Sequence, residues 1–152
     1  MSTTTAGTTA VTPVSEEHAV ALRWHAEVFE GDRYEAVHDV CTPDFRWHNA
    51  GLPPELRTLE GTKQLARMMR AGFSDYRLPH IAGAPDLVAG DRVVTFWTFV
   101  GTHDGEFLGA APTGRRVEVT GIDAFVVRDG RIAELRQEMD VLGWMRQIGL
   151  VP

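Results

Sequence analysis

Hydrophobic positions recur at helical spacing in the first half of the chain. After Ser15, a favourable N-cap residue followed by two glutamates, apolar side chains recur every three or four residues as far as Gly31. This pattern predicts an amphipathic helix. A second, short helix is expected over 34–41 and a third over 61–73, and the segment 44–49 between them is typical of a short strand.

Longer apolar runs with turn residues between them characterise the second half. We expect strands in four segments and a short helical or turn segment at the end: 76–91, 92–103, 115–128, 131–141 and 142–150. The first of these strands is irregular, because two prolines forbid a continuous ladder. Asp129-Gly130 is the strongest hairpin signal in the chain.

Helices followed by a run of antiparallel strands indicate the α+β fold class, with helices on one face of a curved sheet that encloses a pocket. The strand "VVTFWTFV" is apolar on both faces, so we expect the second face of the sheet to be covered as well, by a second subunit. Residues 14–152 are expected to form one domain. Residues 1–13, rich in Ser and Thr, are expected to be a disordered tail.

Composition narrows the classes of partner. The formal net charge is -6 and Lys63 is the single lysine, which argues against nucleic-acid binding. Cys41 is the single cysteine, so neither an internal disulfide nor a cysteine-based zinc site can form, as is usual in a reducing cytoplasm. The six histidines show no metal-binding spacing, and no apolar run approaches the length of a membrane span. We therefore expect a cytoplasmic protein without a metal.

Charged side chains on the last hairpin are the first candidates for chemistry. A two-residue turn at 129–130 would place Asp123 opposite Arg136, and the alternation of strands would put Asp140 on the same face. Two carboxylates around one guanidinium in a dry pocket can have pKa values pushed apart, which supplies an acid and a base. The same face could equally be solvated or lie at a subunit interface, and a β-bulge would shift the register.

A second set of candidates surrounds the expected pocket. His48 and Asn49 end the early strand and offer hydrogen bonds beside an aromatic ring. The substrate-binding residues expected from the helices and strands are Trp24, Trp47, Asn49, Met68, Phe73 and Trp97. The glycine-rich stretch 101–121 lacks the context of a phosphate-binding loop and is interpreted as a connection between two strands.

The stretch from Gly90 to Gly149 resembles the SnoaL-like polyketide cyclase family of the nuclear transport factor 2-like superfamily. The resemblance rests on the strand before "GTH", the "GEFLG…PTGR" connection, the "DGRI" hairpin and an aspartate before "LG…QIG". It implies a cone-shaped, cystatin-like sheet wrapped around the N-terminal helices, a homodimer, and a pocket that needs no cofactor. It further implies aldol-type ring closure of a hydrophobic small-molecule substrate, with Asp140 as acid and base and His48 in the pocket.

One departure from the family pattern keeps other hypotheses open. Many members have Glu-His-Trp where this chain has Glu134-Leu135-Arg136. An Asp–Arg–Asp cluster of Asp123, Arg136 and Asp140 would instead resemble limonene-type epoxide hydrolases, and so suggests an epoxide hydrolase or an epoxide-opening cyclase. Cofactor-free hydroxylation of a polyketide and simple binding of a small molecule are the further alternatives.

Overall fold

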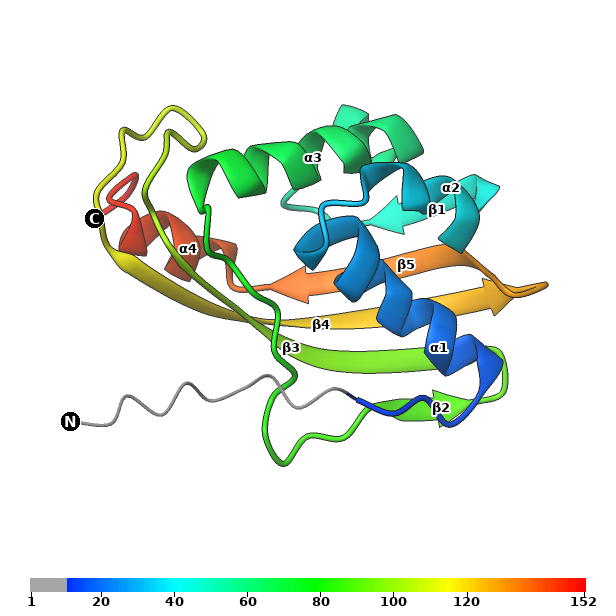
Figure 1. Cartoon of the computed structure of the whole chain (residues 1–152). Helices are drawn as coiled ribbons and strands as arrows, with labels where there is room; N and C mark the ends of the chain where they lie inside the picture. Colours follow the sequence, from blue (N-terminus) through cyan, green and yellow to red (C-terminus); the bar gives the residue numbers. More distant parts are fainter. Residues whose placement is uncertain (1–10) are drawn as a thin grey trace.

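A bent five-stranded sheet and the helices over its concave face make up the molecule, of which the computed structural model describes residues 11–152 (Figure 1). The strands are β1 Cys41–His48, β2 Leu87–Ala89, β3 Arg92–Thr102, β4 Arg116–Arg128 and β5 Arg131–Met139. The helices are α1 Glu16–Arg23, η1 Trp24–Glu30, η2 Tyr34–Ala36, α2 Val37–Val40, η3 Pro54–Arg57, α3 Leu59–Gly72 and α4 Val141–Gln147. The tail expected over 1–13 lies largely outside the described residues.

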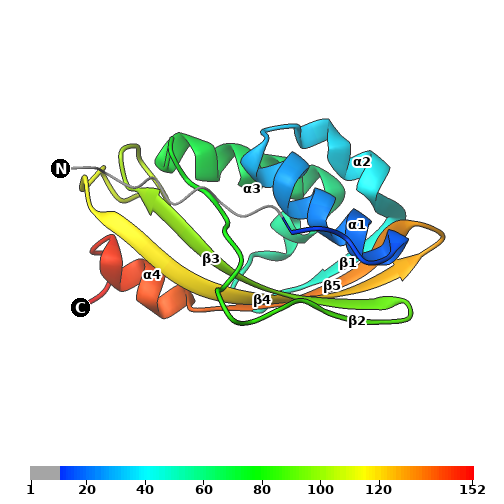
Figure 2. The ribbon, with the colours of Figure 1, turned by 60° about the horizontal axis from the view of Figure 1, so that its bottom comes forward.

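The sheet is mixed, with strand order β1-β5-β4-β3-β2. Strands β2 to β5 pair antiparallel, whereas β1 runs parallel to β5. Figure 2 shows the curvature of the sheet, with α1, α2 and α3 on one side and α4 beside the N-terminal end of β4. The α+β class and the curved sheet around N-terminal helices are therefore confirmed. Within residues 11–152, no helix is long and apolar enough to span a membrane.

The N-terminal helix begins as expected but changes its winding. Ser15 caps it by accepting a hydrogen bond from the backbone N–H of His18 at 3.1 Å. From Trp24 the helix continues as a π-helix, which widens each turn and brings the neighbours Trp24 and His25 both into the interior. Ala26, which the helical periodicity placed on the apolar stripe, is exposed instead.

The hairpin between β4 and β5 starts in the expected register and then departs from it. Asp129 and Gly130 have φ of 51° and 76°, as a tight hairpin turn requires, and Arg128 pairs with Arg131. A β-bulge follows, because Val127 pairs with Ile132 but Val126 pairs with Glu134. All later pairs are displaced by one residue.

This displacement overturns one prediction. Asp123 pairs with Gln137 on β5 and with Thr95 on β3, so the expected pairing of Asp123 with Arg136 is wrong. Because side chains alternate along a strand, the shift by one residue turns Gln137 toward the helices and Arg136 toward solvent.

Residues 103–115, the middle of the predicted connection 101–121, join β3 to β4, and the two ends of that stretch belong to the strands themselves. Its base is closed by hydrogen bonds between the backbones of His103 and Arg115 and of Gly114 and His103, at 2.9 and 2.8 Å. Farther out, Phe107 and Ala110 form an isolated bridge. The loop folds back over the end of α3, where the Phe107 ring packs against Phe73 at a centroid distance of 5.2 Å.

Candidate active site

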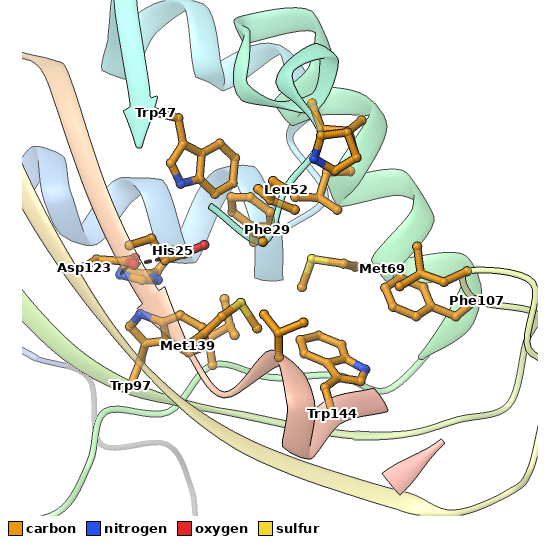
Figure 3. Close-up of a pocket in the computed structure, with 18 of the residues that line it drawn as sticks. His25, Phe29, Trp47, Leu52, Met69, Trp97, Phe107, Asp123, Met139 and Trp144 are labelled. Atoms are coloured by element: carbon orange, nitrogen blue, oxygen red, sulfur yellow. Dashed lines mark hydrogen bonds and ion pairs between the residues drawn. The ribbon is translucent and has the colours of Figure 1, made fainter. Parts of the chain in front are cut away.

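A cavity of about 160 Å³ lies between the helices and the concave face of the sheet. Most of its lining is apolar, and six aromatic side chains contribute to it: Trp24, Phe29, Trp47, Trp97, Phe107 and Trp144. In Figure 3, His25 and Asp123 lie together on one side of the cavity, while Phe107 and Trp144 lie on the opposite side. The cavity therefore has one polar end and a long apolar remainder.

Asp123, in the middle of β4, provides the acidic group of the polar end. Its side chain is fully buried, and Gln137 Nε2 donates a hydrogen bond of 2.9 Å to Oδ1. The other oxygen, Oδ2, lies 3.3 Å from Nε2 of His25 but makes no hydrogen bond of good geometry. One carboxyl oxygen is thus held by a donor, and the second remains available for proton transfer.

Burial dominates the ionisation of this carboxyl. Loss of hydration raises the pKa of Asp123 from 3.8 to about 7, although the Gln137 amide and the nearby ring N–H of Trp97 act in the opposite direction. Among the described residues that line the cavity there is no lysine or arginine that could stabilise the anion. The carboxyl consequently changes between its acid and base forms near neutral pH.

His25 faces Asp123 from η1 and stays neutral in the same pH range. Burial, and to a smaller extent the neighbouring His80, lowers the pKa of His25 from 6.5 to about 3. Nε2 of His25 also lies 3.1 Å from the hydroxyl oxygen of Thr95. A neutral imidazole beside a carboxyl of pKa near 7 can exchange a hydrogen bond with it without forming a fixed ion pair.

Comparison with known proteins settles the family. The family model of SnoaL-like polyketide cyclases matches residues 19–148. The chain belongs to the SnoaL-like polyketide cyclase family. The family predicted from the sequence is therefore confirmed. No curated protein matches the chain significantly.

Solved structures of the same fold include proteins of several bacteria. TsrD from Streptomyces laurentii is 29% identical, with 93% of this chain and 100% of that chain aligned and a TM-score of 0.74. IdmH from Streptomyces antibioticus, described as a "putative polyketide cyclase", is 28% identical, covers 89% of this chain and 99% of its own, and has a TM-score of 0.70. A protein from Acidithiobacillus ferrooxidans, at 22% identity, coverage of 93% and 100% and a TM-score of 0.77, supports the fold alone.

Four of the residues predicted for the site of this SnoaL-like protein line the cavity. They are Trp24, Trp47, Trp97 and Asp123. Phe73 and Met68 do not line the cavity. Phe73 is fully buried in the core, where its ring meets that of Phe99 edge to face at a centroid distance of 5.1 Å. Met68 is half-buried and packs against the core. Helical spacing identified both as inward-facing, but it could not separate the core from the wall of the cavity.

Asn49 is buried without lining the cavity. Both ends of its amide are occupied, since Nδ2 donates to Gln137 and Oδ1 accepts from the backbone N–H of Gly51. The prediction that it contacts substrate is therefore replaced by a role inside the wall. His48, the preceding residue, is half-exposed and lies 3.7 Å from Glu134, outside the cavity lining.

The predicted Asp–Arg–Asp cluster does not form. Arg136 is exposed on the outer face of the sheet. Asp140 is exposed too, and it caps α4 by accepting a hydrogen bond of 2.8 Å from the backbone N–H of Gly143. Of the three residues, Asp123 alone reaches the cavity, so the expectation that Asp140 and Arg136 join it there is wrong.

Sequence reasoning missed two polar residues of the site, His25 and Gln137. His25 was missed because the apolar stripe of a regular α-helix would pass through Leu22, Ala26 and Phe29, whereas the π-helix buries His25 and leaves Ala26 exposed. Gln137 was missed because the bulge shifts the register, and no residue type in β5 indicates a bulge at that point. The one available signal was the position of Asp123 itself, a carboxylate inside an apolar run that requires polar neighbours.

Proposed function

We propose that this protein is a cofactor-independent cyclase that uses Asp123 as acid and base on a polyketide or related secondary metabolite. The observation that carries the proposal is a fully buried carboxyl at the polar end of an apolar cavity, with one free oxygen and a pKa near 7. A general acid–base group is most effective when its pKa lies near the working pH. Membership of the SnoaL-like family supports the same class of reaction.

The reaction needs only one carboxyl that works twice. In the base form, Oδ2 of Asp123 removes a proton from a carbon between carbonyl groups, and the resulting enolate is delocalised over the substrate. The enolate carbon attacks a second carbonyl of the same molecule, which forms the ring bond and leaves an alkoxide. The acid form of Asp123 then returns its proton to this alkoxide, so that all atoms balance and the enzyme is regenerated.

The lining favours an uncharged, flat and largely apolar substrate. Aromatic rings supply most of the contact surface, and a ring system can stack against Trp24, Trp47 or Trp97. A substrate carboxylate would find no counter-charge in the cavity and would meet the partly ionised Asp123. An ester or a ketone is consistent with this lining, while a free acid is not.

The experiment is to incubate the purified protein with neutral poly-β-carbonyl esters and, separately, with neutral epoxides, and to follow the products by mass. Ring closure leaves the mass unchanged or removes one water, hydroxylation adds one oxygen atom, and epoxide hydrolysis adds one water. Asp123→Asn should lose most of the turnover, whereas Asp140→Asn should keep it, because asparagine is an equally good N-cap and Asp140 lies outside the cavity.

Two further results bear on the proposal. The kcat/KM of the wild-type protein should rise with pH through about pH 7, as Asp123 enters its base form. Full turnover by Asp123→Asn would refute the proposal. Tight binding of these compounds without any product would favour the binding-protein alternative instead.

A further inference from the structure

A chain of three hydrogen bonds runs from the buried carboxyl into the loop after β1. Gln137 Nε2 donates to Asp123 Oδ1 at 2.9 Å, and Asn49 Nδ2 donates to Gln137 Oε1 at 2.7 Å. The chain ends at the backbone, where the N–H of Gly51 donates to Asn49 Oδ1 at 2.9 Å. All three side chains in the chain are at least nine-tenths buried.

The direction of this chain is determined at its backbone end. A side-chain amide can present either its oxygen or its nitrogen to a neighbour, so Asn49 and Gln137 could each point either way in isolation. A backbone N–H can only donate. Because the N–H of Gly51 requires the oxygen of Asn49, the nitrogen of Asn49 must face Gln137, and the nitrogen of Gln137 must then face Asp123.

A fixed donor makes the two oxygens of Asp123 unequal. Oδ1 always receives the N–H of Gln137, so the proton of the acid form belongs on Oδ2. Nε2 of His25 lies 3.3 Å from Oδ2. His25 is the titratable group that faces Asp123 in the described structure. The ring of His80 packs against that of His25 at a centroid distance of 6.0 Å.

We propose that Asn49 is a positioning residue: anchored by the Gly51 N–H, it holds the amide of Gln137 as a donor to Asp123 Oδ1 and reserves Oδ2 for the transferred proton. The catalytic role of Asn49 rests on the proposed function, but the orientation of the Gln137 amide does not. The same arrangement links the carboxyl to the cavity wall, because Gly51 and Leu52 line the cavity and Arg57 holds the carbonyl of Leu52 at 2.7 Å.

The test is a double-mutant cycle read by the titration of Asp123. The side-chain carboxyl signals of ¹³C-labelled aspartate are followed by NMR against pH in the substrate-free protein, and the signal of Asp123 is identified by its loss in Asp123→Asn. In Asn49→Ala, Gln137 is free to turn its oxygen toward the acid form, so the midpoint should rise by about one pH unit, the usual effect of one hydrogen bond to a charged group. In the Gln137→Leu background, the same substitution should leave the midpoint unchanged.

Gln147→Ala is the matched control. Gln147 also holds β4 with its amide, through two hydrogen bonds to the backbone of Glu118 at 2.8 and 3.0 Å, and neither residue lines the cavity. Its loss should not move the titration of Asp123. If Asn49→Ala does not fold, Asn49→Asp replaces it: the added charge then acts in both backgrounds, and only the excess shift in the presence of Gln137 measures the orientation.

An unchanged midpoint in folded Asn49→Ala would overturn the proposal, as would an equal shift with and without Gln137. These outcomes can be distinguished from a failure of the proposed function. Since the titration requires no substrate, the predicted shift can occur in a protein that closes no ring. Conversely, Asp123-dependent turnover with an unshifted Asn49→Ala would refute this inference alone.

Discussion

The buried pair of His25 and Asp123 predicts an unusual dependence of stability on pH. The pKa of Asp123 is raised on folding from 3.8 to about 7, so its contribution to stability is complete below pH 3.8 and is lost as the pH rises to about 7. The pKa of His25 is lowered from 6.5 to about 3, so its contribution is complete above pH 6.5 and is lost as the pH falls to about 3. The two contributions have opposite slopes over almost the same range.

Their magnitudes are similar as well. Each pH unit between the folded and unfolded pKa of one group changes the free energy of unfolding by about 1.4 kcal/mol, so the shift of about three units at Asp123 corresponds to about 4 kcal/mol. The shift of His25 corresponds to about 5 kcal/mol with the opposite sign. In the wild-type protein the two terms nearly cancel, and single substitutions should expose each of them.

Urea unfolding of the wild type, Asp123→Asn and His25→Gln at a series of pH values measures both terms. Relative to the wild type, the free energy of unfolding of Asp123→Asn should increase by about 4 kcal/mol from pH 4 to pH 7. That of His25→Gln should decrease by about 5 kcal/mol from pH 3 to pH 6.5. Other titrating groups are common to all three proteins and drop out of the differences. Curves that run parallel would show that neither pKa is shifted by burial.

Three further predictions concern other parts of the molecule. Gly121→Ala should destabilise the fold by about 2 kcal/mol in thermal or urea unfolding, because an added Cβ would lie 2.2 Å from the Trp97 ring. Cys41 should resist thiol reagents until the protein unfolds, since burial raises the pKa of its thiol, and rapid modification of the native protein would contradict this. We predict a homodimer that covers the outer face of the sheet, where Ile122 is an exposed apolar side chain. Light scattering should give twice the chain mass for the wild type and a lower mass for Ile122→Asp, and a monomeric wild type would refute the prediction.

The broad architecture follows from short-range signals that the sequence displays openly. The Ser15 cap, the turn at Asp129-Gly130 and the apolar runs of β3 and β4 each act within a few residues, and each lies in the structure where the pattern predicts it. The start of β1 was less visible. This edge strand begins at Cys41 rather than Asp44, because it gains its hydrogen bonds from β5, which is some ninety residues away in the chain.

The site was harder to predict, because it depends on two irregularities in otherwise regular elements. The π-helical turn buries His25 beside Trp24, and the bulge shifts β5 by one residue. Neither requires a special residue type, so periodicity alone gives a smooth helix and an unbroken ladder. Asp123 was predictable because burying an acidic side chain costs free energy, so a carboxyl in an apolar strand must have polar partners or a function.

The bulge in β5 determines the chemistry as well as the register. With an unbroken ladder, Arg136 would lie across from Asp123, and a guanidinium at that distance would hold the carboxyl ionised, with a pKa well below its usual range. The displacement by one residue replaces this cation with Gln137, a neutral donor that orients the carboxyl without fixing its charge. An ion pair would have given a stable anion and a poor proton donor. The neutral partner leaves Asp123 near a pKa of 7, where one group can take a proton and return it.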